Sequence, residues 1–466
     1  MLNQIFAKKP LVSDPEDTGL RRCLSAFDLT MLGIGAIIGT GIFVLTGHAA
    51  ATQAGPAVIL SFVVAGLACT FAALAYAELA ASVGGIGSAY GYSYAAFGEL
   101  LAWIIGWDLI LEYAVSVAAV ANGWSGYFVT AMAAIGVPIP EPLTKSPEAG
   151  GLINLPAVFI IIALMVMLII GIKQSARLNA GMVFIKLLTI VVFISVALFN
   201  INPGNWDVFM PYGWFETLAD GKTVGVLAGA SLVFFAYVGF DAVSTAVEEA
   251  KDPQRDIPRG ILWSLGFCTL VYIIVSGLLT LVVPYYELEV PSPVAHALHL
   301  LGINWAAALV ATGVITGLTT VMLVLYYALT RIIMGMSRDG LLPAFFGHVN
   351  EKTHTPVRNT VICGVVMASF AGLVPLGVLA ELVNIGTLAA FVMVCVGVIV
   401  LRKTQPDLPR PFKIPGGLVV PVLGILSCGA LIAFLPAVTH LRFVIWLLLG
   451  VVVYFCYSMR HSKLRA

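Results

Sequence analysis

The sequence predicts an all-α membrane protein with twelve transmembrane helices, and three observations support this fold class. Of the 466 residues, 60% are hydrophobic and only 10% are charged. The mean hydropathy is +1.00. A soluble domain of this length cannot bury so large an apolar fraction in its core, so much of the chain must be solvated by lipid. The third observation is a regular series of apolar runs, each close to the length of about 20 residues that a helix needs to cross the hydrocarbon core.

The apolar runs are separated by clusters of charged residues, proline or asparagine, which mark the loops. Twelve spans are expected by this criterion. They cover residues 28–52, 56–82, 96–120, 154–172, 179–200, 224–248, 259–284, 303–332, 358–377, 380–401, 418–437 and 441–458.

The lysines and arginines of the loops predict how the chain is oriented, because basic residues are retained on the cytoplasmic side of a membrane. With both termini in the cytoplasm, twenty of the 24 basic residues lie on the inner side and only Lys145, Lys222 and Arg442 lie outside. The remaining one, Lys186, falls inside the fifth span. We therefore expect a multi-pass protein of the plasma membrane with both termini in the cytoplasm.

The first and sixth spans are five spans apart, so they cross the membrane in opposite directions, as an inverted repeat of five plus five helices requires. This predicts a division of the chain into a cytoplasmic tail (1–27), a first repeat (28–200), an inverted second repeat (224–401), two further helices (418–458) and a second cytoplasmic tail (459–466).

The first span contains the segment "GIGAIIGTGIF" (33–43), whose glycines weaken a helix in its middle. A helix that stops and restarts inside the membrane leaves unpaired amides at one new end and unpaired carbonyls at the other. The restarted half would direct its amides and its positive dipole end at an anion such as a carboxylate. The candidate binding residues here are Ile38, Gly39, Thr40 and Gly41. Close helix packing through a GxxxG-type surface is the alternative interpretation of the same glycines.

The sixth span contains a similar interruption, Tyr237-Val238-Gly239, at about the same depth. The carbonyls at the end of its first half would attract a cation such as an ammonium group. The candidates are Phe235, Ala236 and Val238, and Asp241 could add a carboxylate one turn later. Two opposite half-helix ends would therefore match the two charged ends of an α-amino acid.

Several segments resemble a known family of transporters. The segments "FDLTMLGIGAIIGTGIF", "FFAYVGFDAVSTAVEEAKDPQRDIPRGI" and "SRDGLLP" are similar to those of the amino acid–polyamine–organocation (APC) transporters. The segments "GWDLILEY" and "NGWSGY" resemble the cationic amino acid transporter branch. The resemblance covers nearly the whole chain. It implies the leucine-transporter fold, with helices 1–5 and 6–10 as inverted repeats, helices 1 and 6 broken, helices 11 and 12 outside the repeat, and alternating access by rocking of one bundle against a scaffold.

Two ionisable residues inside spans are candidates for proton coupling. Lys186 lies about 10 Å into the bilayer, and a lysine at such depth usually faces the bundle interior and serves a function. We expect its ammonium to tether the break in the first helix, where sodium-driven relatives of this fold hold a cation, and the resemblance implies a proton-linked role. The alternative is that its side chain reaches back to the headgroups. Glu112 is the second candidate; the resemblance implies proton exchange or water-mediated contact with substrate, and a structural carboxyl is the alternative.

The eighth span carries Leu325 at a position where, by the resemblance, transporters of arginine have a small residue. A branched side chain there predicts small neutral amino acids such as alanine as substrates. Leu325 facing lipid or packing in the core is the alternative.

The leading functional prediction is a proton-coupled amino acid symporter that uses no cofactor and no metal ion. An exchanger of amino acids or polyamines, and a transporter of lysine or arginine, remain alternatives. A membrane enzyme is disfavoured because no HExxH motif, Cys/His ligand cluster or Ser-His-Asp set lies at membrane depth. A net charge of zero excludes nucleic acid as an electrostatic partner. A nutrient sensor and a small single-span partner subunit are left open.

Overall fold

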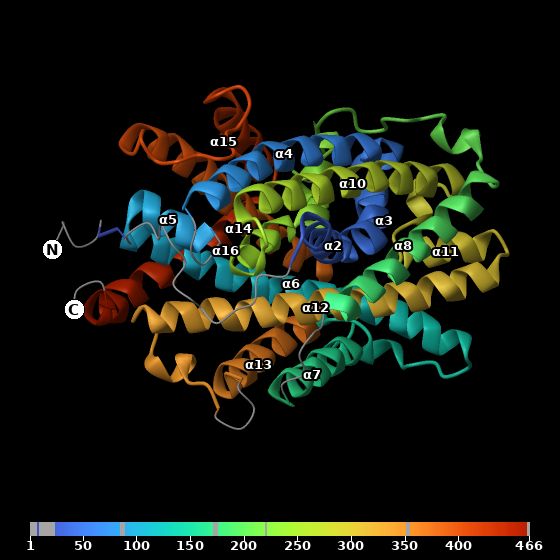
Figure 1. The fold of residues 1–466 in the computed structure, drawn as a ribbon. Helices are drawn as coiled ribbons and strands as arrows, with labels where there is room; N and C mark the ends of the chain where they lie inside the picture. Colours follow the sequence, from blue (N-terminus) through green and yellow to red (C-terminus); the bar gives the residue numbers. More distant parts are fainter. Residues whose placement is uncertain are drawn as a thin grey trace.

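The computed structural model describes residues 7–8, 24–83, 89–170, 176–219, 221–350 and 355–463 (Figure 1). Most of the expected N-terminal tail and residues 464–466 of the expected C-terminal tail lie outside the described residues.

The described chain is mostly helical. The longest helices are α4 (Val58–Val83), α6 (Glu99–Ala134), α8 (Ala176–Leu198), α10 (Pro253–Val282), α12 (Asn304–Arg338) and α14 (Leu376–Thr404). The others are α2 (Ala26–Ile37), α3 (Thr46–Ala49), α5 (Ala89–Phe97), α7 (Leu155–Ile170), α9 (Val226–Val233), α11 (Pro293–Leu300), α13 (Val357–Leu373), α15 (Val419–Ala433), α16 (Ala437–Val453) and α17 (Met459–His461). Two short strands of two residues each, β1 (Glu216–Thr217) and β2 (Thr223–Val224), pair antiparallel, with Glu216 opposite Val224.

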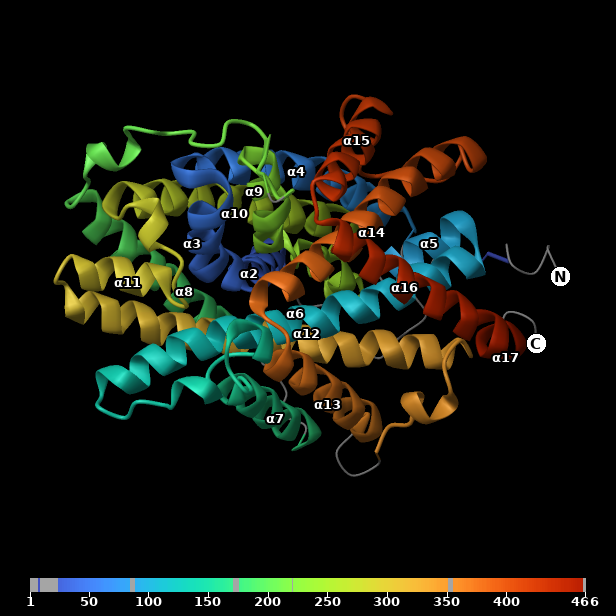
Figure 2. The same cartoon turned by 180° about the vertical axis from the view of Figure 1, so that it is seen from behind.

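Eight helical segments of the described residues are long and apolar enough to cross a membrane, and four shorter apolar helices, α2, α7, α13 and α15, accompany them. The long helices α4, α6, α10 and α12 run along a common direction, with α4 packed on α10 and α6 on α12 (Figures 1 and 2). Large apolar side chains point outward from this bundle, for example Phe159 on α7 and Leu448 on α16. The protein is therefore a multi-pass membrane protein.

The observed helix ends differ from the expected spans where sequence length alone set the boundary. The third span was expected to end at residue 120, but α6 continues to Ala134. Polar Asn122 does not stop the helix, because its side-chain amide donates to Ala118 O and Ala371 O. The chain leaves the helix only where Gly136 adopts a positive φ of 82°.

One buried ion pair fastens the chain between α14 and α15 to the bundle. Arg402 near the end of α14 donates two hydrogen bonds, of 2.8 and 2.5 Å, to the carboxylate of Glu78 on α4. The same carboxylate accepts a hydrogen bond of 2.8 Å from Ile414 N. Arg410 Nε also lies 3.8 Å from this carboxylate, which is 2% exposed, so loss of Glu78 would leave two arginines without their acidic partner.

Candidate functional site

The first interruption predicted from the glycines is present in the backbone. Helix α2 ends at Ile37, and Ile38 has extended dihedral angles of −72° and 103°. Regular hydrogen bonding resumes in a π-helical turn at Gly41–Leu45, which continues into α3. The backbone at Ile38 and Gly39 is therefore non-helical, whereas Thr40 already has helical dihedral angles. The first N–H groups of the restarted helix have no partner within that helix.

The glycines of this segment also allow close packing, so both interpretations of the pattern apply. A Cβ atom on Gly41 would lie 2.2 Å from Ala236 Cα. A Cβ atom on Gly33 would lie 2.4 Å from Ser264 Oγ. Only glycine permits these approaches, and the approach at Gly41 brings the first interrupted segment against the second.

The second interruption follows α9. The chain forms a 3₁₀ turn at Phe234–Tyr237, becomes extended at Val238 and then adopts a φ of 112° at Gly239. A second 3₁₀ segment runs from Phe240 to Glu249. Two features require glycine at position 239: the left-handed conformation, and the proximity of Ala36 O, which would lie only 3.1 Å from a Cβ atom added there.

A tyrosine of α10 lies between the two interruptions. The hydroxyl of Tyr272 is 2.9 Å from Ile37 O and 2.8 Å from Ala236 O. A hydroxyl carries one proton, so it can donate fully to only one of these carbonyls at a time. Tyr272 is fully buried and stacks edge-on against Tyr237, whose own hydroxyl donates to Phe62 O.

Lys186 of α8 contacts the first interruption directly. Its ammonium donates hydrogen bonds of 2.7 Å to Gly35 O and 3.1 Å to Ile38 O. The side chain is 1% exposed and passes Gly317 of α12, where any side chain would collide with it. The side chain therefore extends from α8 into the space between α2 and α12, and it does not reach the membrane surface. Its role in proton coupling stays a prediction.

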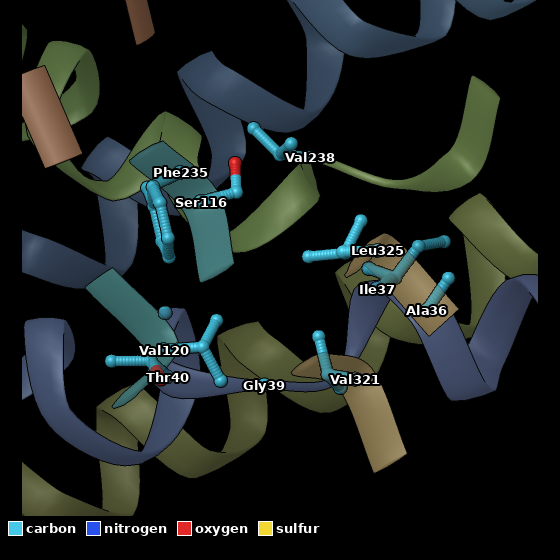
Figure 3. A pocket seen from close by; sticks show the side chains of 11 residues that line it. Ala36, Ile37, Gly39, Thr40, Ser116, Val120, Phe235, Val238, Val321 and Leu325 are labelled. Carbon is cyan, nitrogen blue, oxygen red and sulfur yellow. The ribbon is translucent and has the colours of Figure 1, made fainter. Parts of the chain in front are cut away.

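A cavity of about 20 Å³ lies between the two interruptions, α6 and α12 (Figure 3). This volume holds little more than one water molecule, so an amino acid requires the surrounding helices to move apart. Six expected site residues line the cavity: Gly39, Thr40, Gly41, Phe235, Val238 and Leu325. Leu325 thus faces the cavity and not the lipid, and it is 5% exposed.

Two hydroxyl groups at the cavity have unused hydrogen-bonding capacity. Thr40 Oγ1 and Ser116 Oγ are buried and have no hydrogen-bond partner among the residues that the structure describes. Buried hydroxyls normally have partners, so two such groups at one small cavity point to a polar ligand. Thr40 also packs closely on α6, where a Cβ on Gly123 would lie 2.5 Å from its methyl group.

The other expected binding residues lie beside the cavity without lining it. Ile38 and Ala236 direct their carbonyls at Lys186 and Tyr272, respectively. At the cavity itself, the carbonyl of Phe235 accepts a hydrogen bond of 3.3 Å from Val238 N. A carbonyl oxygen has two lone pairs, so these groups can accept a second hydrogen bond from an ammonium group.

The acidic residues form a separate buried cluster between α6, α14 and the Phe240–Glu249 segment. Asp241 accepts a hydrogen bond of 3.2 Å from the hydroxyl of Tyr113, and it interacts electrostatically with Glu112. Asp108, one turn before Glu112, faces Gly386 of α14, where a Cβ would lie 2.6 Å from Asp108 Oδ1. Neither Glu112 nor Asp241 lines the cavity.

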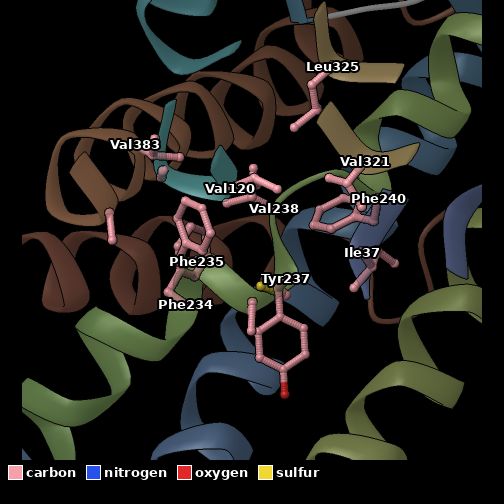
Figure 4. Packing of buried hydrophobic residues seen from close by; sticks show 14 of the residues in the cluster. Ile37, Val120, Phe234, Phe235, Tyr237, Val238, Phe240, Val321, Leu325 and Val383 are labelled. Carbon is pink, nitrogen blue, oxygen red and sulfur yellow. The ribbon is translucent and has the colours of Figure 1, made fainter. Parts of the chain in front are cut away.

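Five further residues line the cavity that sequence reasoning did not single out: Ala36, Ile37, Ser116, Val120 and Val321. Figure 4 shows Val120 and Val238 next to Phe235, with Val321 and Leu325 farther away on the opposite side, whereas Tyr237 points away from these residues. Spacing could have suggested Val321, which lies one turn before Leu325 on α12. The cavity wall is mostly apolar, and no charged side chain of the described residues belongs to it.

Comparisons with known proteins agree on one family. Residues 24–456 match the family model described as amino acid permease. The branched-chain amino acid permease BcaP of Bacillus subtilis (strain 168) is 50% identical over 473 residues, which cover 100% of both chains. The methylthioribose transporter of the same organism is 48% identical and covers 99% of this chain and all of its own. The human cationic amino acid transporter 4 is 39% identical over 86% of this chain and 64% of its own length.

Proposed function

The chain belongs to the amino acid permease family, and from this premise we propose that it imports small neutral L-amino acids such as alanine by proton-coupled symport. Members of this family are membrane transporters and not enzymes. The observation that carries the proposal is the pair of interrupted helices around a shared cavity, with the unpartnered hydroxyls of Thr40 and Ser116 in its wall.

The binding mode follows from the dipoles at the interruptions. The substrate carboxylate binds the free amides of residues 39–42 and the Thr40 hydroxyl, because the amino end of the restarted helix is positive. The substrate ammonium binds the carbonyls near Phe235 and Val238, with Asp241 adding negative charge from one turn away. The substrate side chain then lies toward Leu325.

The proposed architecture is the leucine-transporter fold with twelve spans. The eight long apolar segments and four shorter apolar helices support this number. The long segment Gly41–Val83 contains both the second half of the first span, which begins with α2, and the whole second span, α4. Residues 28–200 and 224–401 form the inverted repeats, and residues 418–458 add two helices. The tails, 1–27 and 459–466, lie in the cytoplasm of a plasma-membrane protein, as the distribution of basic residues supports.

Proton coupling uses Lys186 and Glu112. The bonds from Lys186 to Gly35 O and Ile38 O link the charge of this side chain to the shape of the first interruption. Burial disfavours a charged ammonium, so a transport cycle that alternately buries and hydrates Lys186 binds and releases a proton. Glu112 exchanges the proton with the cluster around Asp241.

Neutral branched-chain amino acids are a second candidate substrate class. Two observations favour this class. The relative with 50% identity, BcaP, is named a branched-chain amino acid permease, and the wall of the cavity is mostly apolar. Lysine and arginine are disfavoured because Leu325 occupies the space beyond the α-carbon and no charged side chain of the described residues lines the cavity.

The test starts with a thermal-unfolding screen of the twenty amino acids on purified protein, followed by uptake into liposomes with pH gradient and voltage set independently. Symport predicts that an inside-alkaline gradient accelerates uptake at zero voltage. Uptake that ignores the pH gradient and rises with internal substrate would instead identify an exchanger of amino acids or polyamines.

A further inference from the structure

A pocket of about 470 Å³ opens at the amino end of α10 and shares no lining residue with the substrate cavity. Its wall combines α10 with Pro411 and Phe412 of the segment between α14 and α15. The volume falls within the range of about 300–1,000 Å³ that is typical of ligand pockets.

Two arginines give the pocket its charge. Arg255 and Arg259 are one helical turn apart on α10, so they share a face of the helix. Neither forms an ion pair or side-chain hydrogen bond within the part of the chain that the structure describes. Asp252 is the one acidic residue among the described residues that line the pocket. The backbone N–H of Asp252 donates a hydrogen bond to the carboxylate of Asp256. The arginines therefore leave the pocket with a net positive charge.

An apolar stripe continues from the pocket along α10. Trp263 lines the pocket and is 56% exposed. Phe267, Leu270 and Ile274 follow at helical spacing and are 40%, 58% and 38% exposed. The helix thus changes from basic to aromatic to aliphatic in the order in which a membrane changes from headgroup to interface to hydrocarbon.

We propose that this pocket binds the phosphate headgroup of an anionic phospholipid, whose acyl chains lie along the stripe from Trp263 to Ile274. The guanidinium groups of Arg255 and Arg259 hold the phosphate, because their planar forks match its oxygens. The proposal depends on the cytoplasmic position of this end of α10, since basic pockets at the inner leaflet attract anionic headgroups. The lipid would bind a helix whose Tyr272 faces both interruptions of the substrate site.

The test measures the thermal unfolding midpoint of the purified full-length protein in detergent during titration with dioctanoyl phosphatidylglycerol. We expect the lipid to raise the midpoint of the wild type. The double variant Arg255→Gln/Arg259→Gln should bind it about 30-fold more weakly, the loss expected for two arginines at a membrane surface. The matched control, Arg358→Gln/Lys403→Gln, removes two exposed basic residues elsewhere and should retain wild-type binding.

Parallel titrations identify the source of the phosphate. Dioctanoyl phosphatidylcholine and inorganic phosphate should each give a smaller shift, because the first is zwitterionic and the second lacks acyl chains. Equal shifts from inorganic phosphate and phosphatidylglycerol would overturn the lipid assignment, and equal affinity of the double variant and the wild type would overturn the site. Stabilisation by the amino acid substrate, measured on the same variants, establishes that they are folded and tests the transport site separately.

Discussion

Gly41→Ala should separate the two interrupted segments. The added Cβ would lie 2.2 Å from Ala236 Cα and 2.4 Å from Ala236 Cβ. Carbon atoms in contact prefer about 3.5–4.0 Å, so the segments must move apart by about 1 Å or more. Overpacking of this kind costs about 1–3 kcal/mol. Because the same two segments form the cavity, we expect uptake in liposomes to fall by about fivefold or more, as a cost of about 1 kcal/mol or more implies.

Gly266→Ala is the matched control, because it adds the same methyl group within α10 where no heavy atom lies within 4 Å. Alanine also favours a helix, so this variant should be as stable as the wild type or more stable by up to about 1 kcal/mol. Both variants are first checked for a single symmetric peak in size-exclusion chromatography. Their unfolding midpoints and uptake rates are then compared.

A second substitution separates the proposed contact from a general defect. Ala236→Gly removes the Cβ at 2.4 Å but leaves the Cα at 2.2 Å, so the double variant Gly41→Ala/Ala236→Gly should recover only a small part of the lost stability and uptake. Wild-type uptake and stability in Gly41→Ala would refute the close approach of the two segments. If Gly41→Ala and Gly266→Ala lose equal amounts of stability and uptake, the close approach of the two segments is likewise refuted.

Three other substitutions test individual groups. Lys186→Gln should abolish uptake driven by a pH gradient, while exchange between equal substrate pools persists. Lys403→Gln is the control. If the pH gradient accelerates uptake by Lys186→Gln as much as uptake by the wild type, the proton role is excluded. Leu325→Ser should extend transport toward lysine and arginine, as competition uptake would show, whereas an unchanged substrate range would mean that this side chain does not limit the pocket. Tyr272→Phe should lower the free energy of unfolding by about 1 kcal/mol, because the buried carbonyls of Ile37 and Ala236 lose the hydroxyl that donates to them. An unchanged chemical denaturation midpoint would argue against that contact.

The sequence indicated where the helices break more accurately than where they end. The break near Gly39 was visible because glycines in an apolar run weaken a helix locally. The end of α6 was not, since bilayer length predicted residue 120 while the helix continues to Ala134. The short helices α5 and α11 also escaped prediction, because their nine and eight residues are too few for a span and give only a weak periodic signal.

The sequence likewise predicted the cavity residues that belong to the helix breaks better than those contributed by neighbouring helices. Thr40 and Val238 could be named because they belong to the interruptions, whose position is a local property of the chain. Ser116 and Val120 could not, because α6 is buried on nearly every side and its sequence does not reveal which face meets the cavity. Leu325 depended on the register of the resemblance, which tertiary packing alone could test.

The most direct test of the central claim is the affinity of the purified protein for alanine compared with alaninamide, which lacks the carboxylate, and propanoate, which lacks the ammonium group. If two interrupted helices bind the two charged ends, each analogue loses charge-assisted hydrogen bonds worth about 3 kcal/mol or more, so each should bind about 100-fold more weakly. Leucine, leucinamide and 4-methylpentanoate repeat the comparison for a branched-chain substrate. Binding of either analogue within a few-fold of its parent amino acid would contradict the account.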